Sequence, residues 1–481
     1  MKLLFLTPPM RNWVRWGQKH IACNPLHAHL AAFVRERKVA DVDALDCRAL
    51  ELSQEEMLER IRALAPDAVF LGTRLVTDGG ASPVVFNLEA MSALKEAFPR
   101  LITILGGLGV SAIPKEIIGL APQLDYLLIG EAEWTLVELL EELKKDAPSL
   151  REIRGLAYRD NDEVQLTPPR PPMQNLSALP MPAYDLFPMS RYIGFSQIEH
   201  YNEAVTSRGC EGACSFCYEW GLIDPRRSGD FFLHRTRSGK LVADEMELLN
   251  KIHGVKALNF MDDDFNSDRQ KMLDLLDELE KRDLDIQWFF MGRARNLMRD
   301  ADLIPRLRRA GCYQVLFGIE AGTDEELANI HKSDERYTID DLKGLVQLLR
   351  NHDIATVGTY MNGFWEDDAE KIKYRYRIVD EIDPDVAVLM LLTPMPGSPV
   401  WRQALRDTRI ETLDLENWDA IHTVMPTRHL SRKELGEISA SANRDFFSRP
   451  ERIERIRNGY SSPYVWKKFA TYQAAAELID R

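Results

Sequence analysis

Three of the six cysteines of the chain lie within eight residues, in the segment TSRGCEGACSFCYEW at 206–220. Cys210, Cys214 and Cys217 have the spacing C-x3-C-x2-C. Cysteine thiolates are ligands for zinc and for iron–sulfur clusters. Four interpretations compete: a zinc site, a disulfide, a chance cluster and an iron–sulfur cluster held by three thiolates.

Each alternative makes a different demand on the rest of the chain. A structural zinc site needs four ligands, and His200 and Cys312 could complete one, although neither has zinc-finger spacing. A disulfide would leave an odd cysteine, and Cys23 and Cys47 are scattered as buried cysteines usually are. A chance cluster is disfavoured because the segment follows a predicted strand, where site loops begin. Three thiolates on a four-iron cluster leave one iron open, which is useful only if another molecule binds there.

Length and charge limit the class of protein. A chain of 481 residues exceeds what one core covers, so two or three domains are expected. The net charge is 61 − 75 = −14, which argues against sequence-independent binding of nucleic acid. No apolar run has the roughly 18 residues of a membrane span, and MKLLFLTPPM does not read as a signal peptide. We expect a cytoplasmic protein.

Residues 1–150 alternate strand-like and helix-like segments. This pattern predicts a Rossmann-like parallel sheet with helices on both faces, which binds ligands beyond the carboxyl ends of its strands. No G-x-G-x-x-G follows the first strand, so a dinucleotide is not favoured. The predicted strands are 2–9, 41–47, 68–74, 101–107 and 126–130.

The remaining chain divides into three further parts. Residues 151–199 are rich in proline and predict an extended connector between domains. Residues 200–400 contain about six strand–helix units, fewer than the eight of a closed barrel, so a partial barrel is predicted. Residues 401–481 are expected to be helical. The predicted barrel strands that follow the cysteines are 257–265, 285–295, 313–322, 356–364 and 386–397.

The cysteine segment resembles the cluster loop of radical S-adenosylmethionine (radical SAM) enzymes, with Phe216 as the aromatic residue before the last cysteine. The resemblance implies a [4Fe–4S] cluster on the three cysteines, with the amino and carboxylate groups of S-adenosylmethionine on the fourth iron. It also implies an electron donor such as flavodoxin or ferredoxin and a small-molecule substrate. Phe216 is assigned with the residues that bind S-adenosylmethionine.

Two later strand ends resemble family motifs in the family's order. In FMDDDF (260–265) the resemblance assigns Asp263 to the amino group of S-adenosylmethionine, while a neighbouring aspartate could instead cap a helix. In MGRARN the resemblance assigns Arg293, with Arg295 as its rival, to the carboxylate. Either arginine could equally be a surface residue.

The fourth-strand motif is GIEAG (318–322), in which Glu320 is assigned as a contact to S-adenosylmethionine. The segment TYMNGFWED keeps Gly363 and Phe364 of the family pattern, but Trp365 replaces the usual proline. Gly363 is assigned to the same ligand. The replacement puts the packing of the adenine in doubt and leaves the fold expectation unchanged.

The first 150 residues resemble the cobalamin-binding domain of one branch of these enzymes, so the resemblance covers about residues 1 to 400. It assigns Gly106 and Gly107, where the backbone can approach the corrin closely, together with Thr73 and Glu131. The chain lacks D-x-H-x-x-G, and Leu108 and Gly109 stand where relatives often have Pro-His. A vestigial domain that only supports the barrel is the alternative. Trp13 and Trp16 could cover a ligand or lie at a domain interface.

The resemblance implies reductive cleavage of S-adenosylmethionine to a 5′-deoxyadenosyl radical. In this branch it favours cobalamin-dependent methylation of an unactivated carbon or phosphorus in a small molecule. The alternative is a radical enzyme of the same architecture that cyclises, rearranges or transfers another group, with or without cobalamin. A non-catalytic electron-transfer protein is disfavoured, because ferredoxins are small and use four thiolates per cluster.

Overall fold

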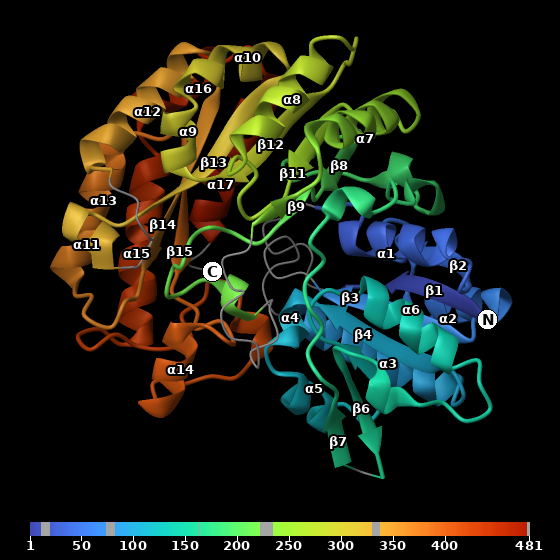
Figure 1. The fold of residues 1–481 in the computed structure, drawn as a ribbon. Coiled ribbons are helices and arrows are strands. Elements are labelled where there is room, and N and C mark those ends of the chain that lie inside the picture. The colour runs from blue at the N-terminus through green and yellow to red at the C-terminus, as the bar shows by residue number, and fades with distance from the viewer. Residues whose placement is uncertain (11–19, 74–81, 162, 222–233, 330–336, 479–481) are drawn as a thin grey trace.

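A computed structural model describes residues 1–10, 20–73, 82–161, 163–221, 234–329 and 337–478. Within these residues the chain forms two large sheets that lie in different halves of the molecule (Figure 1). The predicted fold class is confirmed: a Rossmann-like sheet, a partial barrel and a helical C-terminal region. Trp13 and Trp16 lie outside the described residues.

The N-terminal sheet has seven strands in the order β2-β1-β3-β4-β5-β6-β7, and its first five strands are parallel. Successive residues of β1 enter different cores, with Leu3 and Phe5 on one face and Leu4 and Leu6 on the other. Helices must therefore cover both faces. The strands and helices before residue 143 are β1 (Lys2–Thr7), α1 (Pro25–Glu36), β2 (Asp41–Asp46), α2 (Gln54–Leu64), β3 (Ala68–Thr73), α3 (Ser82–Ala97), β4 (Ile102–Gly107), α4 (Leu108–Ser111), α5 (Pro114–Leu120), β5 (Tyr126–Leu128) and α6 (Glu133–Glu142).

The start of the proline-rich segment differs from the extended connector that its composition predicts. β6 (Leu156–Asp160) and β7 (Glu163–Leu166) form an antiparallel pair that extends the N-terminal sheet beyond β5. Leu156 and Tyr158 are buried in the core of this domain. Because the two strands are short, their apolar pattern is a weaker signal than the prolines that follow, which predict an extended connector. The domain boundaries predicted at residues 150 and 199 stay predictions.

The second sheet is a parallel, six-stranded partial barrel with the strand order β15-β14-β13-β12-β11-β8. β8 and β15 are the two ends of this order, so the sheet is open between them. The aromatic residues Trp288 and Phe290 pack with the buried side of helices α7 and α8 in one core. The strands and helices are β8 (Tyr201–Ala204), α7 (Gly239–Lys251), β11 (Ala257–Phe260), α8 (Arg269–Leu279), β12 (Gln287–Gly292), α9 (Ala294–Arg299), α10 (Ile304–Arg309), β13 (Cys312–Glu320), α11 (Asp324–Asn329), α12 (Ile339–Asn351), β14 (Ala355–Asn362), α13 (Ala369–Ile382) and β15 (Val386–Leu391).

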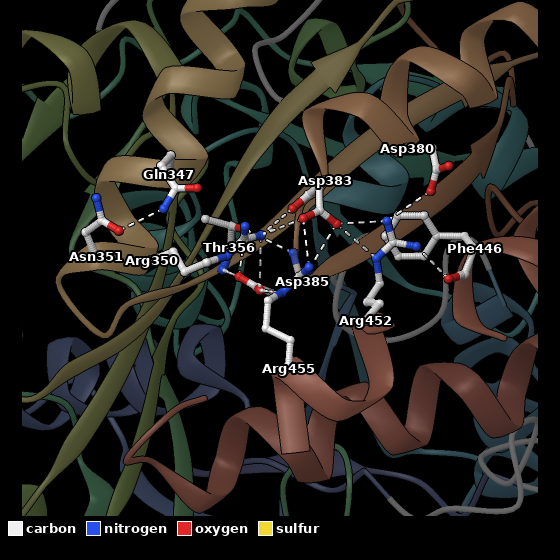
Figure 2. Close-up of polar contacts among 10 residues, drawn as sticks. All are labelled: Gln347, Arg350, Asn351, Thr356, Asp380, Asp383, Asp385, Phe446, Arg452 and Arg455. Carbon is white, nitrogen blue, oxygen red and sulfur yellow. Dashed lines mark hydrogen bonds and ion pairs between the residues drawn. The ribbon is translucent and has the colours of Figure 1, made fainter. Parts of the chain in front are cut away.

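The C-terminal region is helical, with α14 (Pro399–Arg406), α15 (Arg432–Phe447), α16 (Pro450–Asn458) and α17 (Pro463–Leu478). α16 is joined to the amino end of the barrel by ion pairs, which Figure 2 shows. Arg452 and Arg455 approach Asp383 to 2.9 Å and 2.8 Å. Arg350 of α12 lies 3.2 Å from the same carboxylate. No helix in the described residues is long and apolar enough to cross a membrane.

Candidate active site

The three cysteines follow β8 at the carboxyl end of the barrel, and their thiols gather around Gly212. A methyl group built on Gly212 would lie 3.4 Å from Cys210 Sγ and 3.7 Å from Cys214 Sγ. The thiol of Cys217 is close enough to Cys210 and Cys214 for both to raise its pKa electrostatically. The Cys210 and Cys214 sulfurs therefore lie beside one small volume, with Cys217 nearby, which fits the ligands of a single cluster.

Backbone amides already point at two of these sulfurs. The Gly212 N–H donates to Cys210 Sγ (3.3 Å), and the Glu219 N–H donates to Cys217 Sγ (3.4 Å). Burial raises the pKa of the Cys210 thiol and raises the pKa of Cys217 well above its usual value. A coordinating metal deprotonates a thiol outright, and the amide donors would then stabilise the thiolates.

The structure separates His200 and Cys312 from this loop. His200 precedes β8 and Cys312 opens β13, so both lie at the amino end of the barrel, whereas the cysteine loop is at the carboxyl end. Among the described residues, no three His, Cys, Asp or Glu side chains are arranged around a single metal ion, and all six cysteines are free thiols. The arrangement fits three ligands spread over a cluster better than a zinc site or a disulfide.

The chain before the loop is fixed by Asp262, the second residue after β11. Its Oδ1 accepts hydrogen bonds from the Thr206 N–H and hydroxyl, each at 2.9 Å, and from the Ser207 hydroxyl. The Lys271 ammonium adds a 2.8 Å bond to Thr206 Oγ1, and burial lowers the pKa of this lysine to about 8. Asp262 is fully buried and is a support for the cysteine loop, not a helix cap.

The two aspartates that follow reach the loop itself. Asp263 accepts a hydrogen bond from the hydroxyl of Tyr218, the residue after Cys217. Asp264 lies with its carboxylate 3.8 Å from Cys210 Sγ and accepts a bond from Asn296 (3.3 Å). Asp263 is half-buried whereas Asp264 is fully buried, so Asp263 is the better placed of the two for a ligand. Its role with S-adenosylmethionine stays a prediction.

The two candidate arginines occupy different surroundings. Arg293 is 6% exposed and its guanidinium carbon lies 3.8 Å from the methyl position on Gly212, beside the cysteines. Arg295, two residues later on α9, is exposed. The geometry favours Arg293 as the cation next to a ligand of the cluster, and the carboxylate contact remains a prediction.

Glu320 ends β13 in a conformation that non-glycine residues rarely adopt. Its φ is 64°, and the pairing of β13 with β14 shifts at this point. The residue is 8% exposed, and its carboxylate accepts a hydrogen bond from the Thr359 hydroxyl (3.2 Å). Left-handed backbone at such residues costs free energy and concentrates at functional sites.

The loop of Gly363 is held by a buried charge network that sequence reasoning missed. Asp367 Oδ2 accepts from the N–H groups of Gly363 (2.9 Å) and Phe364 (3.2 Å). Arg375 of α13 binds both oxygens of Asp367 at 2.9 Å and 3.0 Å, and also reaches Glu326 at 3.1 Å. One arginine therefore joins α11, which follows β13, to the loop after β14. In the sequence, Asp367 of FWED gave no sign that it would be buried.

A second missed contact comes from α14, almost two hundred residues after the cysteines. The Val400 N–H donates to the Ser215 carbonyl (3.1 Å) inside the cysteine loop. The neighbouring Phe216 packs edge-on against Phe364, with ring centres 6.1 Å apart. Trp220 closes the loop with a 2.9 Å bond to the Cys214 carbonyl. The loop is thus held from both sides of the barrel opening.

At the carboxyl edge of the N-terminal sheet, the predicted residues Thr73, Gly106 and Gly107 lie together. Thr73 Oγ1 donates to the Gly106 carbonyl (3.2 Å), and Gly107 has φ 106°. A methyl group on Gly107 would lie 2.2 Å from the Thr73 carbonyl oxygen, so this position requires glycine. Among the described residues, the last positions of β3 and β4 carry glycines and one small hydroxyl residue, which fits the close approach of a large flat ligand such as a corrin.

Glu131, the fourth predicted cobalamin contact, has protein partners in the structure. Its Oε1 accepts from Arg235 (2.6 Å) and its Oε2 from the Met173 N–H (2.7 Å). Arg208 lies 3.3 Å from the same carboxylate. A contact of Glu131 to cobalamin stays a prediction, and its observed role is to join the two halves of the molecule.

Comparison with protein families agrees with this geometry. The family model of the radical SAM superfamily matches residues 204–373, and that of the B12 binding domain matches residues 27–140. The protein belongs to the radical SAM enzymes that carry a cobalamin-binding domain. The resemblance seen in the sequence is confirmed, and this family uses a [4Fe–4S] cluster, S-adenosylmethionine and cobalamin as cofactors.

Individual relatives align with nearly the whole length of this chain. An uncharacterized methyltransferase of Pyrococcus horikoshii is 26% identical over 94% of this chain and 93% of its own length. The anaerobic magnesium-protoporphyrin IX monomethyl ester cyclase of Rubrivivax gelatinosus is 28% identical over 93% of this chain and 77% of its own. The solved radical SAM methyltransferase TsrM of Kitasatospora setae has the same fold, with a TM-score of 0.73 and 17% identity over 100% of this chain and 99% of that chain.

Proposed function

We propose that the protein is a cobalamin-dependent radical SAM methyltransferase that acts on an unactivated carbon, or on phosphorus, of a small molecule. The observation that carries this proposal is the contact between α4 and the short helical turn Tyr218–Gly221. α4 begins directly after Gly107, and the turn begins directly after Cys217. The edge suited to a corrin and the loop suited to the cluster are therefore neighbours, as transfer of a methyl group to a radical requires.

The assignments of single residues follow from this placement. Cys210, Cys214 and Cys217 would hold the cluster, while Asp263, Arg293, Glu320 and Gly363 would orient S-adenosylmethionine beside it. When bound, these cofactors would supply a 5′-deoxyadenosyl radical and a transferable methyl group. Arg293 would pair with the carboxylate of S-adenosylmethionine, and Asp263 and Glu320 with cationic or hydroxyl groups. In the same proposal, Thr73, Gly106 and Gly107 would contact the corrin.

The inner face of the barrel suits a radical reaction. Met291 of β12 and Leu316 of β13 are paired in register, and Met261 directly follows β11. All three are only half-buried, whereas Phe290 and Phe317, which are next to Met291 and Leu316 in their strands, are fully buried. These apolar side chains would contact an organic substrate and keep water from the radical. They also imply that the substrate is apolar where it meets the barrel.

A second candidate is a radical reaction without methyl transfer. Cyclases from three organisms are among the relatives, at 26–28% identity over at least 81% of this chain. In that case the same residues would bind S-adenosylmethionine, and the product would gain no carbon. An electron donor of the flavodoxin or ferredoxin type and a cytoplasmic location belong to both candidates.

The test is anaerobic purification, reconstitution with iron, sulfide and hydroxocobalamin, and metal analysis. About four irons and one cobalt per chain would support the methyltransferase. Transfer of a labelled methyl group from S-adenosylmethionine to a co-purified or supplied small molecule would complete the support. Four irons without cobalt, with 5′-deoxyadenosine formed, would favour the second candidate. Zinc without iron would reject both.

A further inference from the structure

A two-stranded ribbon follows the barrel's first strand and faces the N-terminal domain. β9 (Ser207–Arg208) pairs antiparallel with β10 (Arg235–Thr236), so that Arg208 lies directly opposite Arg235. Two like charges opposite each other in a sheet repel. Their arrangement requires anionic partners, and these come from the other domain.

Two glutamates of the N-terminal domain meet the two arginines. Arg208 donates to both carboxylate oxygens of Glu133, one of them at 3.2 Å, and lies 3.3 Å from Glu131. Arg235 donates to Glu131 at 2.6 Å and to the Met173 carbonyl at 2.7 Å. The four charged residues form a continuous ladder, which we call the interdomain ladder.

The interdomain ladder is shielded from water. The side chains of Glu133 and Arg235 are 2% and 9% exposed, and those of Arg208 and Glu131 about one fifth. Burial alone would raise the pKa of Glu133, but Arg208 holds the pKa of this carboxyl below its usual value. Removing one member of a buried pair leaves an unpaired charge, which is strongly unfavourable. The ladder therefore fixes how the ribbon of β9 and β10 lies against the N-terminal domain.

The glutamate side and the arginine side of the ladder lie beside the two proposed cofactor sites. Glu131 and Glu133 follow β5 at the carboxyl edge of the N-terminal sheet. The Ser111 hydroxyl joins the loop after β5 to the end of β4, because it donates to the Gly107 carbonyl (2.9 Å) and accepts from the Gly130 N–H (2.9 Å). At the other end, Arg208 is two residues before Cys210.

We infer that Glu131, Glu133, Arg208 and Arg235 are positioning residues that set the distance and orientation between the cluster and the cobalamin face. The inference rests on the proposed function, in that it assigns cobalamin to the edge beside Gly107. The cysteine loop could otherwise tilt on its stem relative to the N-terminal sheet. A misplacement of about 1 Å between reacting groups can lower a rate on the order of 100-fold, so a rigid ladder would matter for methyl transfer.

The experiment measures a distance that does not depend on cobalamin. A nitroxide is attached to a Leu120→Cys variant, because Leu120 is 79% exposed on α5 of the N-terminal domain. Pulsed electron paramagnetic resonance then gives the distance from the label to the reduced [4Fe–4S] cluster in the reconstituted enzyme. Glu131→Gln with Glu133→Gln should broaden or shift this distribution, while iron content stays that of the parent. An unchanged, equally narrow distribution in the double variant would overturn the inference.

Two further variants separate positioning from general stability. Glu133→Asp keeps the charge and shortens the side chain, so it should shift the distance less than the double glutamine variant. It should also fold even if the double variant fails to fold. Arg35→Gln removes an exposed ion pair to Asp185, also between α1 and the segment after the sheet, and should leave the distance unchanged. An equal change in Arg35→Gln would also overturn the inference. Absence of cobalt from the parent protein would sink the proposed function and leave the distance test intact.

Discussion

Asp383 at the amino end of the barrel is held differently from Asp263 and Glu320 at the carboxyl end. At the amino end, Asp383 is surrounded by Arg350, Arg452 and Arg455, so that its charge is matched within the protein (Figure 2). At the carboxyl end, Asp263 and Glu320 accept hydrogen bonds from the hydroxyls of Tyr218 and Thr359. A hydroxyl orients a carboxylate without neutralising it. The first arrangement serves stability, whereas the second orients carboxylates at the edge where a ligand would arrive.

The largest effect should come from the cysteine loop at the carboxyl end. Cys214→Ala removes one of three thiolates, so we expect iron to fall from about four per chain to near zero and cleavage of S-adenosylmethionine to stop. Circular dichroism should show the fold retained, because Cys214 is partly exposed and forms no disulfide. Cys47→Ala is the matched control, and full iron content in Cys214→Ala would contradict the cluster assignment.

At the amino end we expect a large effect on stability and none on the cluster. Asp385 is fully buried, and its Oδ2 accepts from the Thr356 N–H (2.8 Å) and hydroxyl (3.0 Å). Asp385→Asn leaves nearby arginines less compensated and should lower the free energy of unfolding by about 3 kcal/mol or more. Denaturant unfolding measures this change. Asp302→Asn, at an exposed pair with Arg269, should change little. Equal effects of the two variants would remove the distinction.

The interface beside the carboxyl end should respond to pH. His29 of α1 lies with Nε2 3.3 Å from the Val205 carbonyl, and burial, with Arg237 and Arg208 nearby, lowers its pKa from 6.5 to about 4, against the opposing effect of Glu245 and Glu133. The unfolded chain binds this proton below pH 6.5 and the folded chain only near 4, so stability falls as pH drops through that window. The loss is on the order of 3 kcal/mol and ends below pH 4. In His29→Gln the unfolding free energy should vary less between pH 6.5 and 4. The same slope in wild type and variant would refute the assignment.

The smallest effect should come from Glu320→Gln, which keeps the shape of the side chain and removes its charge. If Glu320 contacts S-adenosylmethionine, the dissociation constant should rise about 10- to 100-fold, as for loss of a charged hydrogen bond. Isothermal titration with the reconstituted enzyme measures it. Glu325→Gln, which alters an exposed carboxylate on α11, is the control from the same region. Unchanged binding in Glu320→Gln would rule out the contact.

Local features of the chain were predictable from sequence. The spacing of Cys210, Cys214 and Cys217 lies within one loop, and the apolar runs at 68–74 and 101–107 closely match β3 and β4. These features depend on neighbours in sequence, where side-chain type and periodicity carry the information. The family and fold class followed from them.

Contacts between distant segments were not predictable. Glu131 reads as a ligand residue in its own segment, and its partners Arg208 and Arg235 lie 77 and 104 residues away. The bond from Val400 to Ser215 joins residues 185 positions apart through backbone atoms, which have no side-chain identity to read. Arg375 and Asp367 looked like ordinary charges of a solvated helix until the structure buried them.

The hydrogen bond between α14 and the cysteine loop has a consequence for the folding of the chain during its synthesis. A ribosome that has translated the three cysteines must still add about 180 residues before Val400 can donate its bond to Ser215. The nascent chain therefore carries three thiols on a loop that is not yet held on its second side, while the N-terminal sheet can already fold. The full support of the cysteine loop therefore forms only after α14 has been synthesised, so the last contacts around the cluster ligands are made late in the folding of the chain.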